Sequence, residues 1–220
     1  KDFISKPFDL DEVLLRVHNM LEVRLLHKEV RNHGKLLEAL ALIDPLTGLA
    51  NRRLLMEKMS MALAHARRNK SAMAVMYLDL DGFKQINDTF GHGTGDELLK
   101  MVARRLVDMV REVDTVARLG GDEFVIALWH IQGTEHVTKV AIKVIEAVAQ
   151  PYLIDDHSVR ITVSAGIGIF PDHGQDADTL LKHADLALYQ AKDAGKNAFR
   201  IFVPNDPPTA ASSQNDNPHD

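Results

Sequence analysis

The chain has 220 residues, enough for one globular domain and an appendage, and its 45% hydrophobic and 26% charged residues are typical of a soluble globular protein. The net charge of -5 excludes a general electrostatic attraction to nucleic acid or to anionic membranes, and the absence of cysteine excludes disulfides and thiolate metal sites. No apolar run is long enough to span a bilayer, so we expect a cytoplasmic protein that has neither nucleic acid nor membrane as a partner. Any phosphate ligand must then be held by local lysines or arginines, or by a metal.

The N-terminal part has the pattern of a long helix. Residues 1–8 suit a strand end and a loop, and a helical pattern runs from Asp9, a candidate N-cap, to about Ile43. Apolar positions at alternating steps of four and three favour a parallel helix pair, as in a dimer stalk; they include Leu26, Val30, His33, Leu37 and Leu40. A long helix packed on its own domain is the alternative.

The rest of the chain alternates helices and strands. We expect a turn at 44–51, a helix over 52–68, a buried strand over 72–80, a short helix, a glycine-bearing loop and a helix over about 95–111. Two strands follow at 115–119 and 123–131, then a helix over 134–149, a β-hairpin over 152–170, a helix over 176–194 and a last strand over 198–203. This order predicts an α+β fold in which helices flank a mostly antiparallel sheet, and the proline-rich tail 204–220 is expected to be disordered.

Acidic residues gather at the ends of two predicted strands. Asp79 and Asp81 follow one strand, and Asp122 and Glu123 lie in the turn of RLGGDEFVI, 118–126. If the two strands are neighbours, Asp79 and Asp122 meet at one end of the sheet, where close carboxylates need a proton or a bridging cation such as Mg²⁺. The alternative is that Asp81 caps the following helix and that the two acids of the turn are simply solvated.

Four other polar residues have two interpretations each. Lys192 and Lys196 share a face near the end of the last helix, where they either complement the helix dipole or hold a polyphosphate. Asn87 and Asp96 suit the edge of guanine, because a carboxylate accepts hydrogen bonds from its ring N–H and exocyclic amine, but they equally suit helix ends.

Several motifs resemble the GGDEF family of diguanylate cyclases. They are DPLTGLANRR (44–53), LDLDGFKQINDTFGHGTGDELL (78–99), RLGGDEF (118–124), SAGIG (164–168) and YQAKDAGKN (189–197). The resemblance implies a five-stranded, ferredoxin-like core of the nucleotidyl-cyclase palm type, preceded by a long N-terminal helix. SKPF in the first 27 residues resembles the end of a response-regulator receiver domain. The implied organisation is a receiver remnant (1–27), a helical linker or stalk (28–43), a GGDEF catalytic domain (44–203) and the tail.

The same resemblance assigns roles to individual residues. Asp79, Asp122 and Glu123, with the backbone carbonyl of Leu80, would bind Mg²⁺ or Mn²⁺. Asp122 and Glu123 would be the catalytic residues, and Glu123, beside the metals, would help to activate the attacking hydroxyl. The substrate-binding residues would be Gly120 and Gly121 at the close approach of the nucleotide, Phe83 and Lys84 at the phosphates, Asn87 and Asp96 at guanine, and Lys192 and Lys196 at the terminal phosphates.

The implied activity is the condensation of two GTP into cyclic di-GMP and two pyrophosphates by a homodimer that is controlled by an upstream sensor kinase through the receiver. Arg111 and Asp114 match the family's RxxD motif, which implies an inhibitory site for the product. The alternative functions are a non-catalytic receptor for cyclic di-GMP and a dimerisation module.

Overall fold

The structure, a computed structural model, describes residues 16, 18–24 and 42–204. The chain divides into two compact units, 1–41 and 42–220. In the first unit residues 16 and 18–24 are helical and exposed. The predicted stalk seam, the rest of the receiver remnant and the tail beyond Pro204 lie outside the described residues. Leu42 is in a turn and Ile43 pairs with Ala50 in an isolated bridge, so the helical pattern does not reach Ile43.

The second unit is built on one five-stranded sheet with the order β2-β3-β1-β6-β7. The strands are β1 (Ala72–Asp81), β2 (Thr115–Gly120), β3 (Glu123–Ile131), β6 (Thr162–Phe170) and β7 (Phe199–Ile201). The central strand β1 is antiparallel to β3 and β6, β2 is antiparallel to β3, and only β7 runs parallel to its neighbour. The predicted α+β fold with a mostly antiparallel five-stranded sheet is confirmed.

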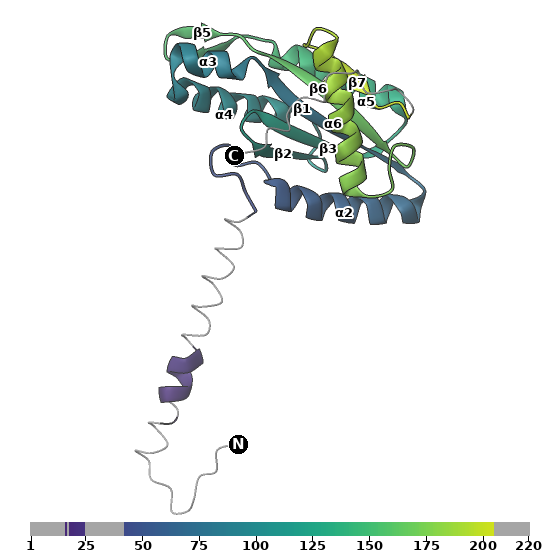
Figure 1. The fold of residues 1–220 in the computed structure, drawn as a ribbon. Coiled ribbons are helices and arrows are strands. Elements are labelled where there is room, and N and C mark those ends of the chain that lie inside the picture. Colours follow the sequence, from purple (N-terminus) through teal and green to yellow (C-terminus); the bar gives the residue numbers. More distant parts are fainter. Residues whose placement is uncertain (1–15, 17, 25–41, 205–220) are drawn as a thin grey trace, which may run out of the picture. The chain divides into compact units, whose positions relative to one another are not determined.

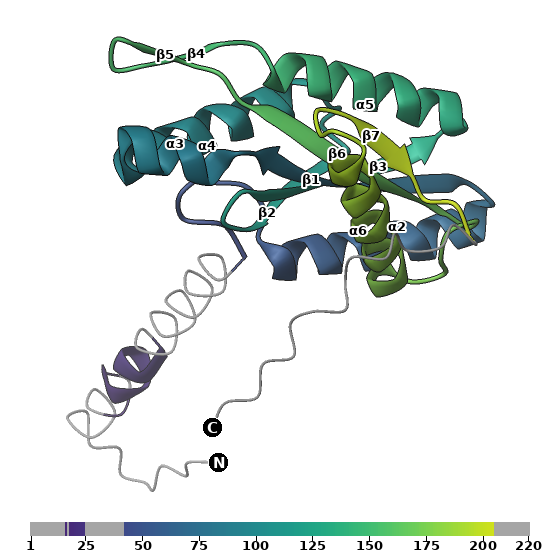
Figure 2. The same cartoon turned by 45° about the horizontal axis from the view of Figure 1, so that its top comes forward.

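Helices cover both faces of this sheet (Figures 1 and 2). On one face lie α2 (Arg52–Asn69) and α6 (Ala177–Asp193), and on the other lie α4 (His92–Asp108) and α5 (Thr134–Val148), with α3 (Phe83–Phe90) beside α4. Successive side chains of a strand point to opposite faces. Met73 and Val75 of β1 therefore pack under α2 and α6, whereas Met76 and Leu78 belong to the core under α4 and α5.

The SAGIG segment explains how closely α6 approaches the sheet. A Cβ at Gly166 of β6 would meet the backbone atoms Ala184 O and Leu188 N of α6, and one at Gly168 would meet Leu180 O. The two glycines thus let the helix backbone lie directly on β6. This contact brings Lys192, near the end of α6, to the strand end that carries Asp79.

Two sequence predictions need correction. The segment GHGTG is not a loop: α4 begins at His92, directly after Gly91, and it ends at Asp108 rather than at Arg111. The predicted single hairpin over 152–170 is divided, because β4 (Tyr152–Ile154) and β5 (His157–Val159) form a separate two-stranded sheet while β6 joins the main sheet. Asp155 and Asp156 do form the turn of that small hairpin, both with positive φ.

Candidate active site

The end of β1 and the RLGGDEF turn lie side by side, as predicted. Asp79 is paired with Glu123 in the β1–β3 register, and Leu80 N–H donates to the carbonyl of Asp122 at 3.3 Å. Glu123 is half-buried and directly opposite Asp79, so both side chains project to the face that α6 covers. The chain thereby assembles carboxylates from two segments more than 40 positions apart at one edge of the sheet.

The turn itself is held by an arginine that sequence reasoning did not assign. Gly120 and Gly121 have φ of 151° and 51°, conformations that favour glycine. Arg118 donates to the Gly121 carbonyl from Nε at 2.9 Å and from Nη2 at 2.7 Å, and its Nη1 binds both carboxylate oxygens of Asp44 at 3.1 and 3.2 Å. The guanidinium therefore ties the signature turn to the DPLTG turn.

Hydrogen bonds and an ion pair stabilise the ionised form of Asp44 where the two turns meet. Its Oδ1 also accepts hydrogen bonds from Thr47 N–H at 2.8 Å and from the Thr47 hydroxyl at 2.6 Å. Burial alone raises the pKa of Asp44, but the hydrogen bonds from Thr47 and the ion pair with Arg118 outweigh burial and leave the pKa below its ordinary value. In the sequence the two residues only open the motifs DPLTGLANRR and RLGGDEF, and neither motif indicates that they pair.

Asp79 has the electrostatic surroundings expected of a cation ligand. Its pKa is raised, first by burial and further by the negative charges of Asp122 and Asp81, whereas Lys192 opposes the shift. The Lys192 ammonium lies 2.8 Å from Asp79 Oδ2. Lys192, from α6, thus stabilises the charged form of Asp79 against burial and the neighbouring acids.

The available donors fit a magnesium ion whose coordination is completed by substrate and water oxygens. Among the residues that the structure describes, no group of three or more His, Asp or Glu side chains could hold a metal by itself. Mg²⁺ commonly takes one or two carboxylates and completes its coordination with water and substrate phosphate oxygens. Asp79, Asp122 and the Leu80 carbonyl would hold such an ion.

The start of α3 has backbone N–H groups that no side-chain cap occupies. The N-cap of this helix is Gly82, which has no side chain to use the first N–H groups of the helix. The N–H groups of Phe83 and Lys84 are thus oriented as in anion sites at helix N-termini. The side chain of Phe83 is buried in the core, so this residue can offer a phosphate only its backbone, whereas Lys84 is exposed.

The predicted guanine ligands come together where α3 meets α4. A Cβ on Gly95 would collide with Oδ1 of Asn87, so the Asn87 side chain lies against the residue that precedes Asp96. Asn87 is half-buried and Asp96 is exposed on the first turns of α4. The two predicted guanine ligands therefore belong to adjoining parts of α3 and α4.

Asp81 is not the helix cap that the alternative interpretation suggested. Its oxygens accept hydrogen bonds from the hydroxyls of Thr162 (2.8 Å) and Ser164 (2.7 Å) and from Asn197 N–H (3.1 Å). Asp81 is thus used to join β1, β6 and the segment after α6. Lys196 is exposed and lies next to Asn197 in that segment.

Arg111 and Asp114 lie at the other end of β2, about 20 Å along the strand at about 3.3 Å per residue. Asp114 accepts hydrogen bonds from Arg111 N–H and Trp129 N–H, both at 3.0 Å, and the Arg111 guanidinium lies 3.2 Å from Nε2 of His136. A cavity of about 280 Å³ adjoins both residues and is also lined by Lys139 and Lys143. Its lining combines three positive side chains, Arg111, Lys139 and Lys143, with the two carboxylates of Asp108 and Asp114.

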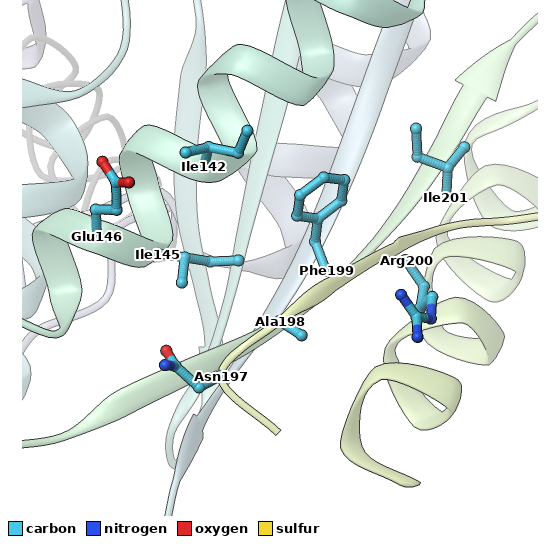
Figure 3. A pocket seen from close by; sticks show the side chains of 8 residues that line it. All are labelled: Ile142, Ile145, Glu146, Asn197, Ala198, Phe199, Arg200 and Ile201. Atoms are coloured by element: carbon cyan, nitrogen blue, oxygen red, sulfur yellow. The ribbon is translucent and has the colours of Figure 1, made fainter. Parts of the chain in front are cut away.

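A second cavity lies away from the acids. It has a volume of about 560 Å³ and separates α5 from β7 (Figure 3). Its walls are largely aliphatic and aromatic, with Ile142, Ile145, Phe199 and Ile201 among them. No convergent set of polar groups marks it as a reaction centre.

Known proteins of similar sequence belong to one family. The family described as "Diguanylate cyclase, GGDEF domain" matches residues 41–198. The bifunctional diguanylate cyclase/cyclic di-GMP phosphodiesterase MucR of Pseudomonas aeruginosa is 45% identical over 163 residues, which cover 74% of this chain and 24% of MucR. This chain therefore spans about a quarter of the length of that relative.

Solved structures show the same fold. The GGDEF domain of TpbB (also YfiN) from Pseudomonas aeruginosa has a TM-score of 0.73 at 36% identity and covers 75% of this chain and 96% of its own. The coiled coil and GGDEF domain of DgcB from Caulobacter crescentus, in complex with c-di-GMP, has a TM-score of 0.75 at 26% identity, covering 84% and 97%. With its acids gathered at the β1–β3 edge and its signature turn intact, the chain belongs to the GGDEF family of diguanylate cyclases.

Proposed function

We propose that this chain is a diguanylate cyclase that condenses two GTP into cyclic di-GMP and two pyrophosphates. The observation that carries the proposal is the pairing of Asp79 with the Asp122–Glu123 turn, with the Lys192 ammonium 2.8 Å from Asp79. Catalytically inactive relatives would not need to keep these acids and a lysine together. The family description, the cyclase part of the name of the bifunctional MucR and the complex of DgcB with c-di-GMP support the choice of product.

The acidic residues at the β1–β3 edge would hold the metal and accept the proton of the attacking hydroxyl. Mg²⁺ or Mn²⁺ held by Asp79, Asp122 and the Leu80 carbonyl would supply a Lewis acid that lowers the pKa of the 3′-hydroxyl and stabilises charge on the α-phosphate. Glu123 would accept the proton of that hydroxyl. Each attack forms a 3′–5′ phosphodiester and releases pyrophosphate.

Other residues bind and orient the substrate. Asn87 and Asp96 bind guanine, which favours GTP over ATP. The first N–H groups of α3 and the side chains of Lys84, Lys192 and Lys196 bind the triphosphate and neutralise the departing pyrophosphate. Gly120 and Gly121 leave room for the nucleotide beside the turn.

The active form is a homodimer, because one domain holds one GTP and closure of the cyclic product needs a second half-site. Residues 1–27 would belong to a receiver domain and 28–43 to a stalk, so that a sensor kinase controls how two sites meet. Sedimentation combined with activity measurements tests this. A monomer with full specific activity would contradict it.

Arg111 and Asp114 form an inhibitory product site. Support comes from the basic cavity around them: arginine can contact guanine O6 and N7 together, and Lys139 and Lys143 can bind phosphates. The same residues would serve the alternative function, a receptor without turnover. Incubation with GTP and Mg²⁺ followed by chromatography separates the two, with Glu123→Gln as the control that retains binding. Binding of cyclic di-GMP without any turnover would favour the receptor.

A further inference from the structure

Asp81 has a set of partners that the proposed chemistry does not use. Its carboxylate accepts three hydrogen bonds, two from the β6 hydroxyls of Thr162 and Ser164 and one from the backbone N–H of Asn197. Ser164 is completely buried, so its hydroxyl is shielded from water and donates to Asp81 instead. An ionised carboxylate is an acceptor only, and three donors suit it well. These oxygens are directed to β6 and to the segment after α6.

That segment has an unusual backbone. Three consecutive residues, Gly195, Lys196 and Asn197, have φ of 115°, 64° and 47° as the chain turns from α6 to β7. Lysine adopts such a conformation rarely, and surrounding contacts must hold it there. Lys196 N–H donates to Ala191 O at 3.2 Å, and Asn197 N–H donates to Asp81. The loop is therefore fastened to α6 on one side and to β1 on the other.

The anchor and the candidate metal ligand share one strand. Asp79 and Asp81 are two positions apart in β1, so both project to the α6 face at a spacing of about 6–7 Å. Lys192 and Lys196 lie at the end of α6 and in the loop that follows it. The end of β1 thus carries Asp79, and through Asp81 it also holds the loop in which Lys196 lies.

We propose that Asp81 is a positioning residue: its carboxylate holds the α6–β7 loop so that Lys196 is placed for the terminal phosphates of the nucleotide. This inference rests on the proposed function for the role of Lys196. Asp81 itself neither touches the substrate nor binds the metal. Ser164 and Thr162 serve to orient its carboxylate.

The test is a double-mutant cycle between Asp81→Ala and Lys196→Ala, read as the affinity for a non-hydrolysable GTP analogue with Mg²⁺. We expect Asp81→Ala to weaken binding about tenfold, the scale of one charge-assisted hydrogen bond. In the Lys196→Ala background the same change should weaken binding less than about twofold. An equal loss in both backgrounds would overturn the proposal. Asp193→Asn, which removes an exposed charge from the last turn of α6, is the matched control and should leave the affinity unchanged.

A second readout does not depend on nucleotide binding. Amide hydrogen exchange at Asn197 should accelerate at least about tenfold in Asp81→Ala, and Asp193→Asn should leave it unchanged. Unchanged exchange at Asn197 would refute the anchor even if the chain proves to be an active cyclase. Accelerated exchange in a chain that binds no GTP would preserve the anchor and reject the proposed function instead. If Asp81→Ala does not fold, Asp81→Asn and Ser164→Ala give the same comparisons with smaller expected changes.

Discussion

Replacement of Arg118 by alanine tests how the signature turn is held. The guanidinium makes two hydrogen bonds to the Gly121 carbonyl and two to Asp44, and the two side chains are only 11% and 16% exposed. Removing one partner of a buried ion pair typically costs about 3–5 kcal/mol. Asp44 would keep its hydrogen bonds from Thr47, and water would reach the exposed Gly121, so we expect a loss of about 2–3 kcal/mol in the free energy of unfolding.

The assay is urea denaturation of wild type and variant, with the slope m expected to stay constant. Because the pKa of Asp44 is lowered in the folded state, the pair contributes fully above the ordinary aspartate pKa and is lost as the pH falls through the lowered value. The difference between wild type and Arg118→Ala should therefore be constant from pH 5 to 8 and shrink below about pH 4.

Two comparisons make this prediction specific. Arg118→Lys keeps the charge but cannot bridge Asp44 and Gly121 with one planar group, so it should lose an intermediate amount. In an Asp44→Ala background, Arg118→Ala should lose at least about 1 kcal/mol less than in the wild type. A loss below about 0.5 kcal/mol, or an identical loss in both backgrounds, would show that the Asp44–Arg118 pair does not stabilise the turn.

Three further predictions follow from contacts of the sheet and its helices. Gly166→Ala should lower the free energy of unfolding, measured by urea titration, by about 1–3 kcal/mol, because a Cβ there meets the α6 backbone. The control is Gly93→Ala, where a Cβ meets nothing, and it should change the free energy of unfolding by no more than about 1 kcal/mol. Lys192→Met should raise Mg²⁺ affinity about tenfold in calorimetry without nucleotide, because the ammonium no longer occupies Asp79, while the KM for GTP rises; a lower Mg²⁺ affinity would contradict this. Arg111→Ala should let cyclic di-GMP accumulate to a higher level in end-point assays. An unchanged final concentration of cyclic di-GMP would contradict the inhibitory site.

The parts of the fold that follow from local pattern were predictable. Short apolar runs marked β1 and β3, and the acids at the end of one and the start of the other predicted that Asp79 meets the signature turn if the two strands are neighbours, as they are. The start of α4 was predicted wrongly, because glycines in GHGTG have low helix propensity. Packing accounts for Gly95, where a Cβ would collide with Oδ1 of Asn87, whereas a Cβ at Gly93 would meet nothing, so packing does not explain that glycine.

The supports of the site could not be predicted from pattern. Asp44 and Arg118 are 74 positions apart, and Asp81 and Asn197 are 116 apart. No local periodicity specifies such pairs, because they depend on which strand ends and turns the completed sheet brings together. Asp81 looked like a helix cap for the same reason: its nearest neighbour in sequence is α3, but its partners come from β6 and the loop after α6.

The proposed activity is the joining of two nucleotides by the carboxylates at the β1–β3 edge. Its most direct test is incubation of the protein with GTP and Mg²⁺, at concentrations where it is dimeric, with chromatographic detection of product. Wild type should release two pyrophosphates for each cyclic di-GMP, and Asp122→Ala, folded to the same extent, should release neither. No product from the dimeric wild type, or undiminished product from Asp122→Ala, would contradict the account.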